Sequence, residues 1–303
     1  MNTILSYLIF PGFLFSSVVG LLAGWVDRKV TARIHFRVGP PWHQNFTDII
    51  KLLGKETIVP EGSKTAFLLS PYLGLLAATL AAAIIGNAII NPSVSFLGDL
   101  IVVLYLLVIP AASLIIGASS SRNPLASVGA SREMKLVLSY ELPFLLSVIA
   151  IIIRSKGALE IGQIVGMQMQ YGSNASYFSG LLAFIAAILC MQAKLGVVPF
   201  DASEAEQEIM GGTLIEYSGM PLAVFKLVKA VLLYTMPLFL TALYLGKDTS
   251  LLFMALKYIA LLVGIILIKN TNPRLRIDQI TRFFWGPVTF ISLAAVILAI
   301  LGL

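Results

Sequence analysis

Eight long apolar runs, separated by polar segments, set the pattern of this 303-residue sequence. The runs are continuously apolar, whereas the strands of a membrane β-barrel would alternate apolar and polar residues. Each run is close to the ~20 residues that a helix needs to cross ~30 Å of hydrocarbon. We therefore predict an all-α, polytopic membrane protein in which residues 1–303 form a single transmembrane domain of about eight helices. The predicted helices cover residues 4–26, 67–90, 97–118, 136–153, 177–198, 219–245, 251–269 and 283–303.

The distribution of Lys and Arg predicts the orientation of the chain. Alternate polar segments hold 15 of the 21 Lys and Arg residues, whereas the connections on the opposite side hold four. Cytoplasmic loops carry such an excess of basic residues. We therefore expect a multi-pass protein of the cytoplasmic membrane of the cell, with both termini outside. The basic segments are residues 27–66, 119–135, 194–218 and 269–282.

The first basic segment contains a predicted amphipathic helix on the cytoplasmic side. Residues 46–56 place apolar side chains at helical spacing, with Asp48 and Lys51 elsewhere on the helix. This pattern is typical of a helix that lies in the membrane interface. A turn is expected at residues 39–41 (Gly-Pro-Pro), and Trp42 suits the membrane–water boundary. Two interpretations stay open: a surface anchor, or a docking platform for a soluble partner.

Composition narrows the possible functions. The chain is 58% hydrophobic and 12% charged, with a mean hydropathy of +0.92, whereas globular domains carry about 25% charged residues. The net charge of +6 then reflects membrane orientation rather than nucleic-acid binding. Cys190, His35 and His43 are the only cysteine and histidines, too few for a cysteine-ligated cluster, a disulfide or a haem pair. We expect no catalytic residues, metal or cofactor in this chain.

One polar connection carries an unusual charge. Residues 198–219 hold five of the chain's 15 acidic residues between two apolar runs. Ser203 and Glu206 have the spacing of a capping box, which would explain acids at a helix start. The glycines at residues 211–212 are expected to interrupt that helix. Glu216 directly precedes an apolar run, where an ionisable side chain is a functional candidate, and it is the strongest one here. The five acids are Asp201, Glu204, Glu206, Glu208 and Glu216.

Two further acids, Glu133 and Glu141, lie eight residues apart on one predicted helix. They differ by roughly 80° in azimuth and 12 Å in height, so one side of a bundle can hold both at two depths. A surface pair with Arg132 is the structural alternative for Glu133. Pro143 follows Glu141 inside an apolar run, where it frees a backbone carbonyl and predicts a local distortion.

Two lysines lie inside the sixth apolar run. Lys226 and Lys229 are seven to ten residues into it, roughly 10–15 Å deep. A charge at that depth needs a partner or water, and Glu141 and Glu216 are the expected partners. Carboxylates and lysines in a low-dielectric site favour proton transfer, because the site shifts their pKa values toward neutrality.

The last basic segment joins the final two predicted helices. Arg274, Arg276 and Asp278 lie there. Two interpretations stay open: orientation charge alone, or ion pairs with a partner or with the acidic segment.

Five separated blocks of the sequence occur in an order that resembles one known family. They are residues 27–40 (D-R-K-V-T-A-R…R-V-G-P), 139–141 (S-Y-E), 199–208 (P-F-D-A-S-E-A-E-Q-E), 216–219 (E-Y-S-G) and 274–279 (R-L-R-I-D-Q). The family is the membrane subunit that seats the peripheral arm of respiratory complex I, that is, the H-subunit family of NADH:quinone oxidoreductase. The similarity covers essentially the whole chain.

Departures from the complex I pattern favour one branch. The loop that begins at residues 39–40 is shorter than in complex I members, and Lys229 replaces a glutamate that is usual in them. The form G-P-P-W-x-Q at residues 39–44 is similar to the counterpart subunits of energy-converting, membrane-bound [NiFe] hydrogenases, which oxidise ferredoxin. Membrane-bound sulfur-reducing complexes share this architecture.

The resemblance implies a non-redox subunit that docks a soluble redox arm and couples its electron transfer to H⁺ or Na⁺ translocation. The implied partners are a nickel–iron-type large subunit, an iron–sulfur small subunit, antiporter-like membrane subunits and the lipid bilayer. The NiFe centre and iron–sulfur clusters would lie in partner subunits. Relay candidates are Asp48, Glu133, Glu141, Asp201, Glu204, Glu206, Glu208, Glu216, Lys226 and Lys229. Docking candidates are Arg33, Arg37, Trp42, Arg274, Arg276 and Asp278.

Four other functions remain as alternatives. The chain would line a quinone cavity in a quinone-reducing complex, or belong to a sulfur-reducing membrane complex. A stand-alone secondary transporter would move its substrate without any partner subunit. Many transporters are built from inverted repeats, and the sequence shows no such repeat. A plain anchor would tolerate neutral replacements of Glu141 and Glu216.

Overall fold

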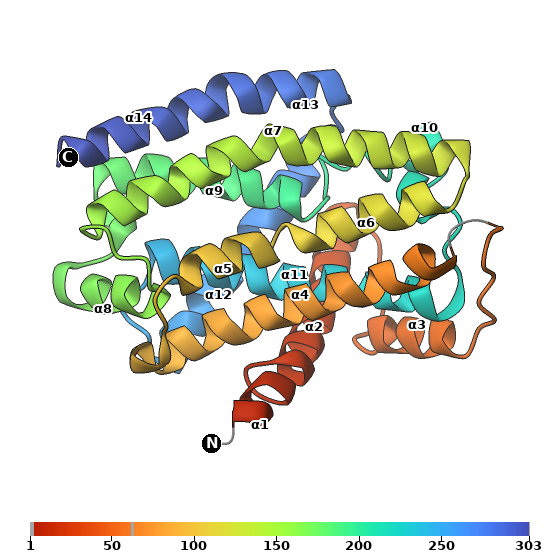
Figure 1. The fold of residues 1–303 in the computed structure, drawn as a ribbon, viewed down its shortest axis with the longest axis horizontal. Coiled ribbons are helices and arrows are strands. Elements are labelled where there is room, and N and C mark those ends of the chain that lie inside the picture. The colour runs from red at the N-terminus through yellow and green to blue at the C-terminus, as the bar shows by residue number, and fades with distance from the viewer. Residues whose placement is uncertain (1–2, 62–63, 303) are drawn as a thin grey trace.

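Long helices run side by side through the structure, and short helices and loops gather at their two ends (Figure 1). This computed structural model describes residues 3–61 and 64–302. Within those residues every regular element is helical, and seven helical segments are long and apolar enough to cross a membrane. Another apolar helix, Phe178–Lys194, is shorter. The prediction of an all-α, polytopic membrane protein is therefore confirmed.

The helices follow one another along the chain with short connections. The α-helices are α1 (Thr3–Leu8), α2 (Phe13–Ile34), α3 (Gln44–Leu53), α4 (Lys64–Ile90), α5 (Asp99–Leu106), α6 (Ile109–Ser120), α7 (Pro124–Arg154), α8 (Ile161–Tyr171), α9 (Phe178–Lys194), α10 (Glu206–Ile209), α11 (Gly219–Tyr244), α12 (Leu251–Thr271), α13 (Ile277–Phe283) and α14 (Thr289–Ile300). Short 3₁₀ turns are η1 (Pro92–Val94), η2 (Asn174–Ser176) and η3 (Gly212–Leu214), and a π-helical segment, η4 (Phe284–Val288), joins α13 to α14.

Each predicted apolar run corresponds to one helical segment, but several boundaries move. Helix α7 begins at Pro124, well before residue 136, because Asn123 caps it by accepting a hydrogen bond from the Leu125 amide. Proline is favourable at this first helical position. The same helix continues without a break past Pro143, so the predicted distortion does not interrupt it. Neighbouring groups in a bundle satisfy the backbone groups that an internal proline frees.

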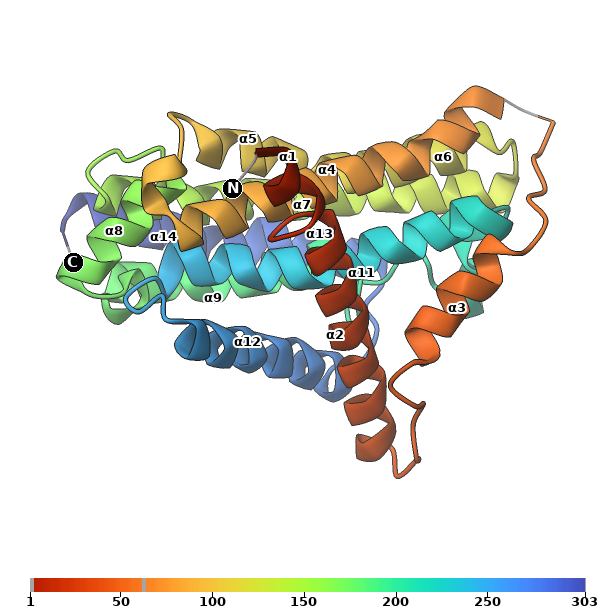
Figure 2. The same ribbon diagram turned by 90° about the horizontal axis from the view of Figure 1, so that it is seen from below.

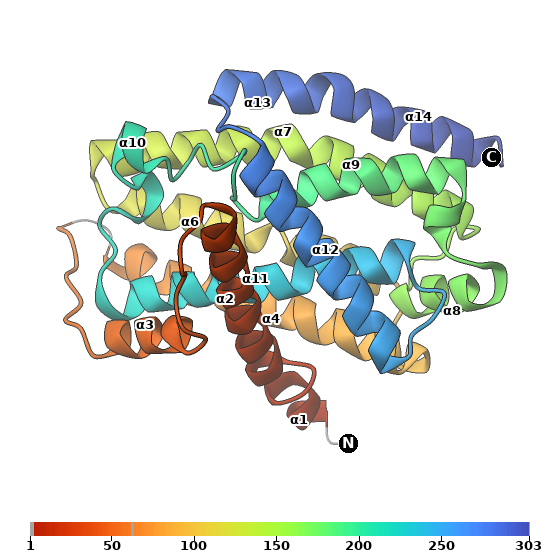
Figure 3. The ribbon, with the colours of Figure 1, turned by 180° about the vertical axis from the view of Figure 1, so that it is seen from behind.

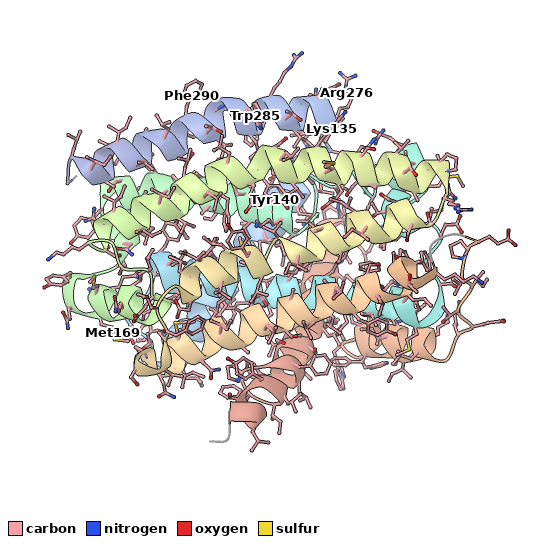
Figure 4. The ribbon with its side chains drawn as sticks, in the orientation of Figure 1. Lys135, Tyr140, Met169, Arg276, Trp285 and Phe290 are labelled. Atoms are coloured by element: carbon pink, nitrogen blue, oxygen red, sulfur yellow. The ribbon has the colours of Figure 1, made fainter. Side chains whose placement is uncertain are left out.

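The interior combines small residues, which allow close helix contacts, with buried aromatic rings. Helix α4 packs on α6 and α11 through fully buried alanines such as Ala78, Ala81 and Ala82. Small side chains let helix backbones approach closely in membrane proteins. Tyr140, labelled in Figure 4, is buried in α7 and meets the Phe284 ring edge-on at a centroid distance of 6.4 Å.

Helices α2 and α12 cross the other helices obliquely (Figures 2 and 3). An ion pair joins these two helices, with Lys269 Nζ 2.7 Å from Asp27 Oδ2. Asp27 was predicted to lie in the polar segment after the first apolar run. It lies within helix α2, which extends as far as Ile34 instead of ending near residue 26.

The short elements divide between two ends of the bundle, which we call the α3 end and the α8 end (Figure 1). The α3 end carries α3, α10 and the loop before α7. The α8 end carries α8, η1 and η2, and there the amides of Ile161 and Gly162 donate to Asp99 and Ser95 over 2.8 and 2.9 Å. Both ends of the described chain lie toward the α8 end: α1 is near the start of α5, and α14, which packs on α7 and α9, finishes at this end (Figures 1 and 3).

The close contact between α2 and α11 gives a stability prediction. A Cβ atom at Gly20 would lie 2.1 Å from the Ala230 carbonyl oxygen. Gly20→Ala therefore forces the helices apart, and such overpacking costs about 1–3 kcal/mol. We expect a lower midpoint of thermal unfolding for the solubilised protein. The matched control is Gly264→Ala in α12, where the described neighbours leave open space; it should leave the midpoint unchanged or raise it. Equal midpoints for the two variants would contradict this packing.

Candidate functional site

A cavity of about 340 Å³ opens between α2, α3, α11 and the loop that follows α9. Its lining includes five charged residues among apolar ones. They are Asp27, Arg28, Asp48, Lys226 and Lys229. Such a concentration of charge is costly within an apolar bundle unless the charges are paired or hydrated.

Helix α3 supplies one wall of this cavity. Arg28 Nη1 donates to Asn45 Oδ1 over 2.7 Å and to Asp48 Oδ2 over 3.2 Å. Gln44 Nε2 donates to the other Asp48 oxygen over 2.8 Å. Burial raises the pKa of Asp48, but the hydrogen bonds from Gln44 and Arg28 outweigh it, so the pKa of this carboxyl is lowered. Asp48 is therefore held as an anion.

The amphipathic helix predicted over residues 46–56 is present, with different bounds. Helix α3 spans Gln44–Leu53. Its polar side contacts α2, whereas Ile50 and Leu53 are exposed, as expected for a helix in the membrane interface.

A second, smaller cavity of about 50 Å³ adjoins the first and shares Lys229, Leu195 and Gly196 with it. The Lys229 ammonium pairs with the Glu204 carboxylate. Glu133 also lines this cavity; it is only 8% exposed, hydrogen-bonds with Ser203 and interacts electrostatically with Glu204 and Lys229. Three charged groups from three chain segments thus meet around one small cavity.

Lys194 continues the line of charges toward α7. It lines the smaller cavity, and its Nζ lies 3.0 Å from Glu141 Oε2. The Lys194 side chain is 3% exposed, whereas that of Glu141 is 22% exposed. Aromatic rings surround the ammonium, with the Phe144 centroid at 4.7 Å and the Tyr140 centroid at 5.5 Å. Glu141 therefore lies where the buried charges reach the side of the bundle.

These residues form one array, which we call the charged row. It runs from the α3 wall through both cavities to α7. Its members are Asp48, Arg28, Lys226, Lys229, Glu204, Glu133, Lys194 and Glu141.

The predicted partners of the membrane lysines are wrong. Lys229 pairs with Glu204, and Glu141 pairs with Lys194. Glu216 accepts a hydrogen bond from Asn123 Nδ2 instead, and it lines neither cavity of the row. Sequence reasoning missed Lys194 as a site residue, because a lysine at the end of an apolar run resembles an orientation charge.

The predicted capping box is also wrong. Helix α10 starts at Glu206 with Ala205 as its N-cap, and no side chain caps it. Ser203 instead hydrogen-bonds with Glu133 and lies before the residue at which the helix begins. The predicted glycine interruption is confirmed: α10 ends at Ile209, and residues 211–212 have positive φ angles of 89° and 48°.

The remaining acids of the segment differ in their partners. Arg132 pairs with Glu208, so the alternative in which Arg132 pairs with Glu133 on the surface is wrong. Glu206 is exposed at the start of α10. Asp201 Oδ2 lies 2.9 Å from Arg274 Nε, and the Asp201 side chain is 12% exposed. Burial raises the pKa of Asp201, although Arg274 opposes that shift.

The docking candidates gather on exposed loops and helix ends. Arg33 is exposed in the last turn of α2, and Arg37 and Trp42 are exposed between α2 and α3, with Trp42 61% exposed. Arg274 forms an ion pair with Asp201 of the acidic segment. For Arg274, this favours the ion-pair interpretation over orientation charge alone. Arg276, at the start of α13 in Figure 4, and Asp278 are exposed.

The described residues contain no group of three or more His, Cys, Asp or Glu side chains placed to hold a metal ion. Cys190 is buried in α9. The arrangement is therefore chemically suited to holding and moving charge, because its members are carboxylates and amines in close pairs.

These features define a polytopic membrane protein in which charged residues line two adjoining cavities at one end. Comparison with known proteins gives its family: the chain belongs to the NADH dehydrogenase family, whose model matches residues 6–300. The resemblance to the membrane subunit that seats the peripheral arm of complex I is thereby confirmed.

Three relatives show how far the similarity extends. The H subunit of NADH-quinone oxidoreductase from Bacillus cytotoxicus is 32% identical, over 93% of this chain and 88% of the relative. Formate hydrogenlyase subunit 4 of Escherichia coli K12 is 31% identical, over 96% of this chain and 97% of the relative. A chain of an archaeal membrane-bound sulfane sulfur reductase has a TM-score of 0.89 at 30% identity, covering 99% of this chain and 100% of that one. These relatives belong to multi-subunit membrane oxidoreductase complexes, which implies that this chain also has partner subunits.

The Asp201–Arg274 pair gives a pH-dependent prediction. Arg274→Gln leaves a largely buried carboxylate with a neutral partner, which should raise the Asp201 pKa further. An acid whose folded pKa exceeds its unfolded value, about 3.9 for Asp, destabilises the folded state as pH rises through that range. We expect the backbone amides of residues 198–205 to exchange faster in the variant than in the wild type at the same pH. This difference should be small near about pH 4 and reach its full size above about pH 7, where it corresponds to about 1–2 kcal/mol.

The double variant Asp201→Asn with Arg274→Gln is the control. It removes the ionisable group, so the pH-dependent part of the change should disappear. Exchange in Arg274→Gln that equals the wild-type rate at pH 7 and above would contradict the role of the pair.

Proposed function

We propose that this chain is the non-redox membrane subunit of a complex I-like, ferredoxin-linked membrane-bound hydrogenase. In this proposal it docks the soluble redox arm and couples electron transfer there to H⁺ or Na⁺ translocation. One observation carries the proposal: two adjoining cavities share Lys229 and connect Asp48, near the docking loops, with Glu141 on α7.

The charged row is suited to coupling because its pairs influence one another. Glu133 interacts with both Glu204 and Lys229, so a proton gained by one carboxylate changes the charge that its neighbours experience. Such interactions are strong where the effective dielectric constant is low. A change of charge at the docking loops would therefore shift protonation along the row as far as Glu141.

The position of Glu141 suggests where the signal leaves the chain. Its carboxylate is the partly exposed member of a pair whose lysine is buried. Antiporter-like membrane subunits beside α7 would sense its charge. The exposed residues Arg33, Arg37 and Trp42 would contact the soluble arm at the α3 end.

The rest of the assembly follows from the same proposal. A nickel–iron-type large subunit and an iron–sulfur small subunit would hold the NiFe centre and iron–sulfur clusters, and this chain would supply no redox group. The α3 end, with its excess of Lys and Arg, would face the cytoplasm, and both termini would lie outside the cell membrane.

The shortened segment at residues 39–44 supports the hydrogenase branch over the quinone branch. The alignment covers 97% of the formate hydrogenlyase subunit, against 88% and 93% of two NADH-quinone oxidoreductase H subunits. The full-length match to the sulfane sulfur reductase chain favours a sulfur-reducing complex as the second candidate. Bound nickel and hydrogen production from reduced ferredoxin by the purified complex would support the hydrogenase. Sulfur reduction without nickel would support the second candidate, and inhibition by quinone-site ligands would support a quinone-reducing complex.

The charged row predicts which acid is required for coupling. Glu133→Gln keeps the size and hydrogen-bonding ability of the side chain but removes its ionisation. We expect the rate of ion translocation to fall by about 10²-fold, the lower end of what a positioned proton-transfer group contributes. The measurement is ion uptake by the assembled complex in liposomes, with redox turnover followed in parallel.

Glu206→Gln is the matched control, because Glu206 is exposed and lies outside the row. It should couple like the wild type. Normal coupling in Glu133→Gln, with loss of coupling in Glu216→Gln, would move the relay away from the two cavities. If Glu133→Gln, Glu216→Gln and Glu141→Gln all show normal coupling, the chain is a plain anchor. Ion transport by this chain alone would identify a transporter.

A further inference from the structure

A third cavity, of about 310 Å³, lies at the α8 end, far along the bundle from the charged row. It is formed where the end of α7 meets α8, η2 and the start of α9. Met169, labelled in Figure 4, lies on α8 at this end. The cavity is lined by Arg154, Ser155, Lys156, Met167, Gln170, Tyr171, Gly172, Asn174 and Tyr177.

Two cations face this cavity, each beside a tyrosine ring. The Arg154 guanidinium carbon lies 3.1 Å from the centroid of the Tyr177 ring, and Nη1 donates to Ser179 Oγ over 3.1 Å. Lys156 Nζ lies 6.0 Å from the Tyr171 ring centroid. Among the described residues that line the cavity, none is acidic. The cavity therefore offers a positive site suited to an anion.

These cations are unusual for their end of the protein. The connections at the α8 end contain only four of the chain's 21 Lys and Arg residues, and two of the four line this cavity. Orientation alone disfavours basic residues on the side opposite the basic loops. Their concentration at one cavity therefore calls for a local binding function.

An apolar surface leads from the cavity along α9. Phe178, Leu181 and Ile185 are 62%, 42% and 42% exposed, and their spacing places them along one face of the helix. Helix α9 has 17 residues, about 25 Å at 1.5 Å per residue, which is shorter than a ~30 Å hydrocarbon core. A short span is accommodated by local thinning of the bilayer, which draws headgroups inward.

We propose that this cavity binds the phosphate headgroup of an anionic phospholipid in the leaflet at the α8 end. Arg154 and Lys156 bind the phosphate, and Tyr171 and Tyr177 lie at the level of the headgroups. One acyl chain lies along Phe178 and the apolar face of α9. Arginine and lysine both bind phosphate through charge-assisted hydrogen bonds, and tyrosine is enriched at membrane interfaces.

The test uses the intact complex, extracted in a mild detergent, and counts the phospholipids that it retains. Arg154→Gln with Lys156→Asn removes both charges with little risk to the fold. Glutamine keeps a donor for Ser179, and asparagine tolerates the left-handed backbone that Lys156 adopts, with φ 51°. We expect the double variant to lose one anionic phospholipid per chain. Lys247→Gln, which removes an exposed cation of the same end that does not line the cavity, should retain it.

A titration of the delipidated complex separates a lipid from a free anion. We expect phosphatidylglycerol in mixed micelles to raise the thermal midpoint of the wild type. The double variant should need about tenfold more, as for the loss of ~1.4 kcal/mol of binding free energy. Inorganic phosphate should have no effect at equal concentration.

Three outcomes would overturn the proposal. The first is an unchanged phospholipid count in the double variant. The second is an equal response to inorganic phosphate, which would identify a free-anion site. The third is a protein of the complex that cross-links to Tyr171, which would show a protein covering the cavity.

Discussion

The cost of burying charge in an apolar bundle is the constraint on which the rest of this structure depends. An unpaired ammonium at the depth of Lys194, whose side chain is 3% exposed, is unfavourable by several kcal/mol, and one at the partly exposed Lys229 by less. Each of these lysines therefore meets a carboxylate from another element, Glu141 on α7 and Glu204 on the loop after α9. Because Glu204 must stay beside Lys229, the loop after α9 lies against α11, and residues 195–197 at its start line the first cavity.

The same constraint explains why the segment after α9 is so acidic. Four of its acids bind four different parts of the chain, so each fastens the loop at a separate point. Asp201 binds the link between α12 and α13, Glu204 binds α11, Glu208 binds α7, and Glu216 binds the residue that caps α7. The acidity is thus partly structural, and the loop can transmit a disturbance to several helices at once. A soluble partner that moved this loop would alter ion pairs on all of them.

The helices could be predicted from sequence because hydrophobic length is a local property of the chain. The pairings could not, because they depend on the path of the loop. Glu216 is near Lys226 in sequence, yet Gly219 adopts φ 56° and packs against the backbone of residues 55–56, and the Glu216 carboxylate meets Asn123. Lys194 lies far from Glu141 in sequence but beside it in space. An ion pair such as Asp201–Arg274 could be predicted as a possibility, because the sequence places these opposite charges on the same predicted side of the membrane.

Helices α7 and α9 connect the two ends of the molecule physically. They pack together, with the Lys194–Glu141 pair toward the α3 end and the Arg154–Tyr177 contact at the α8 end. A shift of one helix along the other would therefore disturb both contacts. The interior between them is filled by side chains such as Phe144 and Tyr244, and close-packed interiors transmit displacement instead of absorbing it. The Arg154–Tyr177 contact adds to this helix packing at the α8 end, outside the charged row.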